Sequence, residues 1–403
     1  MGFQHGLSGL NAAARNLDVI GHNVSNANTV GAKTTRVEFA DMYASAGASA
    51  TFTGLGVTVQ DVNQQFTQGD LTSTNNPLDM AVNGSGFFRI ESPAGEISYT
   101  RNGQFKLDQD GYIVTSSGSR LTGFPADDNG RIQQGVAGAL NLDRANLSPQ
   151  MTTRVDADLN LDSREDMPTA AFDPADATSF NAATSIKVFD QQGRDTTVAL
   201  YFQKTANNAW DIFATADGTQ IGATAVGALA FDNTGAVDQG VTPMPFTLGV
   251  PTAAGGTVTV DVDLSNVTQY GSIFGVTALN QDGYTTGQMV GFGIDKDGTV
   301  MARYTNGETR AQGQIALANF ANPQGLAAMG NNRWAETAES GAPLVGAPES
   351  AGMGGIQSGA LEQSNVDLTG ELVSMIMAQR SYQANAQTIK TQDQVLQTIV
   401  NIR

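Results

Sequence analysis

The spacing of apolar and polar residues divides this chain into two helical ends and a strand-rich middle. Near the C-terminus, apolar side chains recur every seven residues between Val366 and Arg403, in a stretch that contains no proline. This period is typical of a long amphipathic helix with a narrow, coiled-coil-like apolar stripe. The stripe and its flanks are predicted to comprise Leu372, Met375, Ile376, Tyr382, Ala386, Ile389, Leu396, Ile399 and Val400.

Two polar residues, Gln379 and Asp393, interrupt the predicted stripe. One interpretation is a surface helix that packs on its own domain. The other is a helix that assembles with further copies, because polar residues in a seam select register and partner at a cost in stability. The predicted length favours assembly, since an average helix has only about 11–12 residues.

The beginning of the chain repeats this pattern. Between residues 3 and 28, apolar side chains again recur every seven residues and alternate with small ones, which predicts a second amphipathic helix. We expect the two terminal helices to pack side by side and to carry the rest of the chain as an insertion. Because the C-terminal helix is longer, part of its stripe needs another copy as partner. The N-terminal helix is predicted to contribute the seam residues Leu10, Leu17, Ile20 and Val24.

Between the ends, apolar and polar residues alternate over short runs that are separated by glycine-containing turns. This period of two is typical of strands in sandwich or barrel domains. The chain is therefore predicted to be an α+β multidomain protein, with nested, mainly β domains inserted between its terminal helices. Its predicted parts are a terminal helical assembly domain (1–28 with 364–403), an irregular connector (29–71 with 343–363), an inner β domain (72–143 with 285–342) and an outer β domain (144–284).

Charge is concentrated in the middle of the chain. The formal net charge is −18, although only 15% of the residues are charged, and both predicted helical ends are nearly neutral. Neutral ends can pack against further copies, whereas an acidic middle suits exposure to water and argues against nucleic-acid binding. The absence of cysteine excludes disulfide bonds and thiolate metal sites. No apolar run is long enough to span a membrane, and the N-terminus lacks the features of a cleaved secretory signal.

The polar residues form no recognisable catalytic or metal-binding motif. Five acidic turns that end in glycine, such as DQDG at 108–111 and NQDG at 280–283, lack the full ligand set of a calcium loop and are predicted to be hairpin turns. The two histidines, His5 and His22, lie several helical turns apart on the predicted N-terminal helix. A nucleophile elbow is also lacking. We therefore expect no enzyme activity, no catalytic or metal-binding residues, and no cofactor.

Both ends also resemble known motifs. The stretches LNAAARNLDVIGHNVSNANTVGAKTTR (10–36) and SNVDLTGELVSMIMAQRSYQANAQTIKTQDQVLQTIVNIR (364–403) are similar to the N- and C-terminal signatures of bacterial flagellar rod and hook axial proteins. The internal strings LDMAVNGSGFF and YTRNGQFKLDQDGYIV resemble the first β domain of that family. Ala32 departs from the motif, because the family usually has an aromatic residue there. The family motif maps onto Asn26, Asn28, Thr29, Gly31, Lys33, Ser364, Asn365, Asp367, Gln379 and Arg380.

The resemblance implies a structural subunit that polymerises with itself into a helical filament around a central channel. Residues 144–284 match the layout of the hook members, which implies a curved, hollow universal joint that transmits motor torque from the rod to the filament. It further implies contacts with rod, hook-cap and hook–filament junction proteins, type III export without signal cleavage, and an extracellular location in the flagellum. Two alternatives stay open: a long distal-rod variant, and a secreted calcium- or carbohydrate-binding β-sandwich adhesin.

Overall fold

The computed structural model of this chain describes residues 2–43, 54–242, 244–252 and 255–401. Its fold separates into two compact units. The first unit comprises Met1–Asp143, Gly291–Ala302 and Thr309–Arg403, and the second comprises Arg144–Val290 and Arg303–Glu308. The predicted class, with two terminal helices and a mainly β middle, is confirmed, whereas the predicted domain limits stay a prediction.

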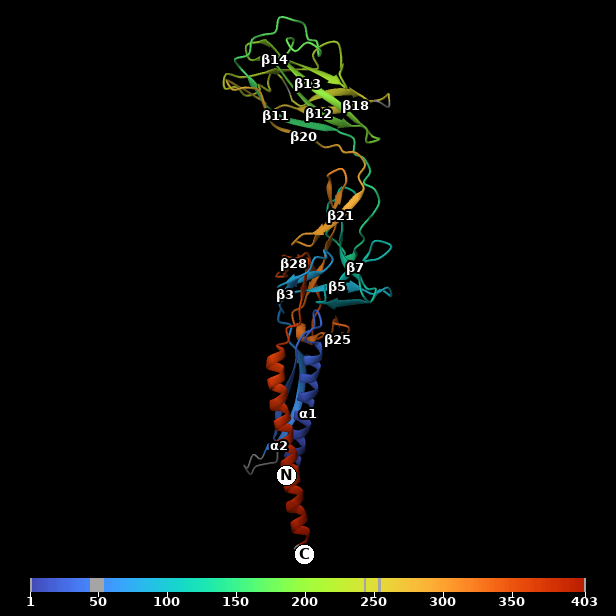
Figure 1. Ribbon diagram of the computed structural model, residues 1–403, viewed down its shortest axis with the longest axis vertical. Helices are drawn as coiled ribbons and strands as arrows, with labels where there is room; N and C mark the ends of the chain where they lie inside the picture. The colour runs from blue at the N-terminus through green and yellow to red at the C-terminus, as the bar shows by residue number, and fades with distance from the viewer. Residues whose placement is uncertain (1, 44–53, 243, 253–254, 402–403) are drawn as a thin grey trace. The chain divides into compact units, whose positions relative to one another are not determined.

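The two ends of the chain form the two described helices, both in the first unit. α1 spans Gly2–Asn26 and α2 spans Leu368–Asn401, close to the limits that the seven-residue period predicts. They lie side by side (Figure 1). Asp367 caps the start of α2, where its carboxylate accepts the backbone amide of Thr369 at 3.0 Å. Neither of these described helices has the length and apolarity that crossing a membrane requires.

A long antiparallel ribbon follows α1 and packs along it. Its strands are β1 (Thr35–Tyr43) and β2 (Gly54–Gln64). The backbone amide of Val57 in this ribbon donates to the hydroxyl of Ser8 in α1 at 3.4 Å. The ribbon occupies the segment that the sequence predicts as an irregular, partly β connector, of which residues 44–53 lie outside the described ranges.

The β part of the first unit is built on a 13-stranded sheet. The first two strands of its main path, β21 and β22, also include residues of the second unit. The strands of its main path are, in order, β21 (Met289–Ile294), β22 (Thr299–Tyr304), β23 (Thr309–Ile315), β9 (Arg120–Pro125), β5 (Phe87–Glu91), β6 (Ile97–Thr100), β26 (Arg333–Ala335) and β25 (Ala327–Gly330). The strands attached to this path are β7 (Phe105–Leu107), β8 (Ile113–Thr115), β10 (Gly138–Ala139), β24 (Leu317–Asn319) and β27 (Leu344–Gly346). A short 3₁₀ helix, η1 (Pro323–Gly325), precedes β25.

Two short strand pairs close the insertion between the helices. β28 (Gly355–Ser358) pairs with β4 (Met80–Asn83), and β29 (Ala360–Glu362) pairs with β3 (Leu71–Ser73). The segment that leads into α2 therefore returns to the segment that follows the ribbon. The buried clusters of this unit include Phe88, Phe105, Ile113 and Leu121 in one, and Phe87, Tyr99, Phe320 and Trp334 in the other.

The second unit is a sandwich of two five-stranded sheets that share one apolar core. Burial alternates along its strands, as the period of two predicts, and the inward side chains include Leu161, Phe202 and Trp210. The first sheet contains, in order, β17 (Phe246–Pro251), β18 (Thr257–Asp263) and β11 (Arg154–Asp162). β19 (Thr268–Tyr270) pairs with the same edge of β11 as β18 does, and β20 (Gly275–Gln281) pairs with the opposite edge. The second sheet contains β12 (Ala182–Phe189), β13 (Asp195–Ala206), β14 (Ala209–Ala216) and β15 (Thr219–Gln220), with β16 (Gly227–Ala230) also on β14.

The acidic turns lie between paired segments in four of the five places, for example at 190–193 between β12 and β13. The prediction is wrong for NQDG, because its first two residues belong to β20. The carboxylate of Asp282 in this string accepts the backbone amides of Thr153 and Arg154 at 2.8 and 3.0 Å. It therefore holds the start of β11 instead of closing a hairpin.

Candidate assembly surface

The two terminal helices meet along a seam of small side chains on α1. A β-carbon on Gly6 would lie 2.8 Å from Cγ1 of Ile389, and one on Gly9 would lie 2.9 Å from the side-chain amide of Asn385. Gly6 near the start of α1 thus faces the later part of α2, so the helices run antiparallel. Close approach of the two helices depends on these positions having no side chain.

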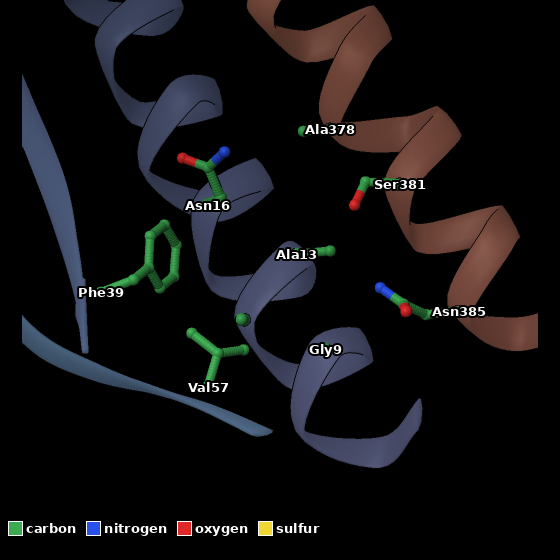
Figure 2. Close-up of a pocket in the computed structure, with 9 residues that line it drawn as sticks. Gly9, Ala13, Asn16, Phe39, Val57, Ala378, Ser381 and Asn385 are labelled. Carbon is green, nitrogen blue, oxygen red and sulfur yellow. The ribbon is translucent and has the colours of Figure 1, made fainter. Parts of the chain in front are cut away.

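A cavity of about 320 Å³ lies beside this seam, where the two helices and the ribbon meet. Figure 2 shows Ser381 and Asn385 extending from α2 toward α1, with Phe39 and Val57 contributed by the ribbon. Small and polar side chains leave this space because they cannot fill it. The lining residues are Gly9, Ala12, Ala13, Asn16, Phe39, Val57, Ala378, Ser381 and Asn385.

The predicted stripe of α2 is largely exposed in the single chain. The exposed fractions are 45% for Leu372, 51% for Ile376, 37% for Tyr382 and 54% for Leu396. Met375 and Ile389 are half-buried on the side toward α1, and the side chain of Ile399 lies outside the described residues. On α1, Ile20 is buried, whereas Leu10, Leu17 and Val24 are half-buried. The role of these residues in polymerisation stays a prediction.

The apolar surface of α2 continues beyond the reach of α1. Because Gly6 already faces Ile389, the last turns of α2 extend past the start of α1 (Figure 1). Val395 and Leu396 lie in those turns with 58% and 54% of their surface exposed. Contiguous exposed apolar side chains of this kind are typical of a surface that another molecule covers.

A network of polar side chains joins the end of α1 to the start of α2. The side chain of Asn23, which is buried in α1, donates to the Thr35 carbonyl at 2.8 Å and to a Glu371 carboxylate oxygen at 3.0 Å, and it accepts the Thr35 amide at 2.9 Å. One amide group thus joins α1, the start of the ribbon and the first turn of α2. Such satisfied buried polar contacts specify one arrangement of the elements.

Asn365, two residues before the cap of α2, makes a second network of this kind. Its side-chain oxygen accepts the amide of Thr34 at 2.7 Å and the hydroxyl of Thr34 at 2.8 Å. Its side-chain amide donates to the carbonyl of Gln65 at 2.8 Å and to the hydroxyl of Thr67 at 2.8 Å. The entry into α2 is therefore held to the residues that lead into and out of the ribbon, which lie together at one end of it.

A buried carboxylate, Glu362, forms a third set of polar contacts near the start of α2. Glu362 forms ion pairs with Lys33 at 2.6 Å and with Arg101 at 3.2 Å, and all three side chains are at most 4% exposed. The Gly69 amide also donates to Glu362, at 3.0 Å, and Lys33 donates a further bond to the Thr67 carbonyl at 2.7 Å. Four segments that are far apart in the sequence therefore meet at one charge.

This cluster places two cations against one anion in a dry environment. Burial lowers the pKa of the Lys33 amine and the pKa of the Arg101 guanidinium, while the neighbouring Glu362 raises both and offsets part of the effect. The guanidinium of Arg101 also lies 5.3 Å from the centre of the Phe87 ring, a distance at which the face of an aromatic ring attracts a cation.

We call the contacts of Asn23, Asn365 and Glu362 the polar junction. Some of the motif residues lie in this junction and others lie on the surface. Gly31 adopts φ +71°, a β-carbon there would lie 2.7 Å from the Asn102 amide, and its own amide donates to the Glu362 carbonyl at 2.9 Å. Lys33, Asn365 and Asp367 act as described above. The side chain of Asn26 donates to the His22 carbonyl at 2.9 Å and accepts the Thr29 hydroxyl at 3.5 Å, and Ser364 accepts the Val366 amide at 3.3 Å. Asn28, Gln379 and Arg380 are exposed.

Three residues of the junction were not predicted as site residues: Asn23, Arg101 and Glu362. Asn23 lies inside a helical period, where a single polar residue is unremarkable. Lys33 and Glu362 are separated by 329 positions, so their pairing leaves no local signal in the sequence. Within the described residues, no group of three or more His, Asp or Glu side chains is arranged to hold a metal ion.

Four models of flagellar protein families match parts of the chain from its beginning to its end. The flagella basal body rod protein model matches residues 3–33, and the flagellar hook protein FlgE/F/G D1 domain matches residues 81–161. The flagellar basal body protein FlaE D2 domain matches residues 160–284, and the C-terminal model of the flagellar basal body rod FlgEFG proteins matches residues 357–402.

The chain is also similar to whole hook proteins. It is 42% identical to the flagellar hook protein FlgE of Salmonella typhimurium over 410 residues, which cover 100% of both chains, and 42% identical to that of Escherichia coli over 409 residues with the same coverage. It is 32% identical to FlgE of Brucella suis over 403 residues, covering 99% of this chain and 98% of the other. The crystal structure of Helicobacter pylori flagellar hook protein FlgE2 shares the fold, with a TM-score of 0.57, 15% identity, and coverage of 72% of this chain and 100% of that one. The chain therefore belongs to the FlgE family of flagellar hook proteins.

Proposed function

We propose that this chain is the structural subunit of the flagellar hook, and that copies of it polymerise into a curved, hollow tube. The tube acts as a universal joint that transmits motor torque from the rod to the filament. The observation that carries this proposal is the exposed apolar stripe of α2, which includes Leu372, Ile376 and Leu396. In water this stripe is costly to leave uncovered, and its natural cover is the helical part of further copies.

The assembly mechanism follows from the two kinds of surface in the chain. A head-to-tail contact that does not close on itself produces an open helical filament. The helices supply this contact in the innermost layer, where tight packing resists twisting and carries torque. The β domains bear most of the acidic charge, lie outside this layer, and exchange weaker contacts as the tube bends.

The specific partners and the route of secretion are part of the same proposal. The two ends of the polymer contact the rod and the hook–filament junction proteins, and the hook cap covers the growing end. Subunits leave the cell through the flagellar type III export apparatus without cleavage of a signal peptide, and they act outside the cell. The support is the family membership together with the near-neutral, assembly-competent ends.

Two alternative functions are not favoured. The full-length similarity to hook proteins, including the FlaE D2 match at 160–284, does not favour a distal-rod protein. The same similarity leaves a calcium- or carbohydrate-binding adhesin without support. The matched family is one of structural proteins rather than of enzymes.

The assembly proposal is tested by a triple substitution of the α2 stripe, Leu372→Ser, Ile376→Ser and Leu396→Ser. These side chains are exposed in the single chain, so the fold tolerates the change, which circular dichroism checks. Each of these side chains is about half-exposed in the single chain, so completing its burial contributes about 1–1.4 kcal/mol, and the critical concentration for polymerisation rises by roughly 100- to 1,000-fold. Sedimentation measures this concentration, and negative-stain electron microscopy detects the tubes.

The matched control is Val136→Ser, at an apolar side chain of the β part that is 93% exposed. It leaves the critical concentration unchanged, because that residue lies outside the helical surface. Normal tubes from the triple variant at the wild-type concentration contradict the proposed role of the stripe.

A further inference from the structure

A second cavity of the first unit, of about 490 Å³, has an almost entirely polar lining. Ten of its twelve lining residues are Asn, Gln, Ser or Thr, and the other two are Arg333 and Ile90. A cavity of this volume is large enough for a small molecule, and its lining favours a polar one. The lining residues lie in the segments 26–29, 90, 100–104, 115–117 and 331–333, all of the first unit.

The charge of this cavity is positive, although the chain as a whole is acidic. The chain has 39 acidic and 21 basic residues, yet none of the described residues that line the cavity is Asp or Glu. Arg333 supplies its one charge, and none of the ion pairs between described residues includes Arg333. A hollow lined by charge of one sign attracts ligands of the opposite sign. The cavity therefore favours an anion.

The guanidinium of Arg333 is partly enclosed without a partner. Its Nε is buried, and no described residue accepts a hydrogen bond from it. An arginine whose stem merely covers apolar surface keeps its polar head in water, which this enclosed Nε does not do. A buried N–H group that lacks an acceptor is costly, and native proteins usually satisfy such groups. An oxygen atom of a bound anion is an acceptor of the required kind.

Neutral side chains of the same cavity supply further donors and acceptors. The side chains of Gln104 and Asn331 are exposed, and neither has a hydrogen-bond partner among the described residues. The side-chain oxygen of Asn102 accepts the Gln104 backbone amide at 3.0 Å, which leaves the NH2 group of Asn102 without a partner among these residues. Amide and hydroxyl side chains together donate and accept hydrogen bonds, so they match the hydroxyl groups of a ligand.

Hydrogen bonds between the lining segments hold the walls of the cavity in place. The Thr100 hydroxyl donates to the Asn332 carbonyl at 2.7 Å and accepts the Asn102 amide at 3.0 Å. The side-chain amide of Asn332 donates to the Val30 carbonyl at 2.9 Å. Asn331 and Asn332 adopt φ of +54° and +52°, a left-handed conformation that asparagine tolerates better than most residues do. Walls that are fixed before a ligand arrives reduce the entropy that is lost on binding.

We propose that this cavity binds a small hydroxylated carboxylic acid. Its carboxylate pairs with the guanidinium of Arg333 through two parallel hydrogen bonds, and its hydroxyl groups bond to the neutral amide and hydroxyl side chains. One cation suits the single charge of a carboxylate, whereas phosphate groups are typically recognised by clusters of arginines. This ligand site adds a function to the chain and does not rest on the proposed hook function.

Ligand titration tests the site with two matched probes, D-gluconate and D-sorbitol. The two molecules differ at one end, where gluconate has a carboxylate and sorbitol has a CH2OH group. Saturation-transfer NMR measures their binding to the full chain, kept below its polymerisation concentration. Gluconate binds with a Kd of about 1 mM, as is usual for a ligand of this size, and sorbitol binds at least roughly tenfold more weakly because it lacks the charge.

Three variants locate the binding. Arg333→Gln removes the cation, so it weakens gluconate binding by at least roughly tenfold and leaves the weak binding of sorbitol unchanged. Arg131→Gln is the matched control, because Arg131 is exposed in the same unit outside the cavity and its loss changes the net charge equally. Asn331→Asp places a carboxylate in the lining, which repels gluconate and not sorbitol, and aspartate tolerates the same φ. Circular dichroism checks the fold of each variant.

Equal affinity for the two probes, or no gluconate signal at about 10 mM, overturns the inference. Gluconate binding that Arg333→Gln and Asn331→Asp leave unchanged also overturns it. A loss in Arg131→Gln as large as that in Arg333→Gln does so too, because net charge alone then accounts for the binding. All measurements use the unpolymerised chain, so a negative result leaves the hook function intact.

Discussion

At the residue scale, one buried carboxylate connects segments of the first unit that are far apart in the sequence. Glu362 touches Lys33, Arg101 and Gly69, which come from three different segments, and it immediately precedes the entry into α2. A buried ion pair adds little net stability compared with an apolar replacement, because both charges lose their hydration. Its physical effect is to penalise any arrangement in which one partner is missing.

Glu362→Gln tests that penalty. The substitution keeps the shape of the side chain but leaves Lys33 and Arg101 as buried cations without an anion, so we expect a loss of about 3–5 kcal/mol in the free energy of unfolding. Urea unfolding followed by fluorescence measures it. Trp334 lies in the first unit and Trp210 in the second, so a Trp210→Phe background reports on the first unit alone.

Glu96→Gln in the same background is the control, because Glu96 is exposed in the same unit. This control leaves the free energy of unfolding unchanged within about 0.5 kcal/mol, as is usual for surface substitutions. If Glu362→Gln lowers the free energy of unfolding no more than the control does, the ion-pair cluster does not impose the proposed penalty.

At the element scale, the sequence predicts the helices better than it predicts how they meet. The seven-residue period gives the limits of α1 and α2 to within a few residues. It places Leu372 on the flank of the seam, whereas Glu371 and Ala378 are the residues that the fold turns toward α1. The reason is that α1 presents glycine and alanine, which accept small and polar partners, and hydrophobic periodicity does not register this preference.

The polar junction is less predictable still. Asn23 and Asn365 lie within or beside a helix, where one polar residue among others carries no distinguishing pattern. Their partners, Thr35 and Thr34, are distant in the sequence or belong to another element. Only the folded chain brings these groups together, so a single sequence reveals such sites through family motifs and not through periodicity.

Two glycines of α1 separate the effect of packing from that of helix propensity. Gly21→Ala has open space for its β-carbon and stabilises the helix by about 0.5–1 kcal/mol, because alanine loses less backbone entropy. Gly6→Ala has the same propensity gain, but its β-carbon collides with Cγ1 of Ile389, and the helices must move apart. Hydrogen exchange of α1 amides therefore slows in Gly21→Ala and accelerates in Gly6→Ala. Equal protection in both variants would show that the seam is loose.

At the scale of the whole molecule, the chain consists of two units that have separate cores and different proposed roles. The first unit contains both helices and has its own apolar clusters, and the second has a core of its own and most of the negative charge. Each unit therefore has the means to fold by itself. On the proposed function, the first unit builds the tube, whereas contacts between second units select its curvature.

Removal of the second unit separates these two roles. Leu147 and Gly287 form an antiparallel bridge, with amide-to-carbonyl distances of 2.8 and 3.2 Å, so a two-residue Gly-Gly turn can replace residues 148–286 without straining the chain. The shortened chain keeps the entire helical surface and polymerises into tubes. Because it lacks the contacts between second units, these tubes are straight, whereas the full-length chain gives curved ones under the same conditions. Electron microscopy measures the curvature of both polymers, and curved tubes from the shortened chain would assign the bend to the first unit.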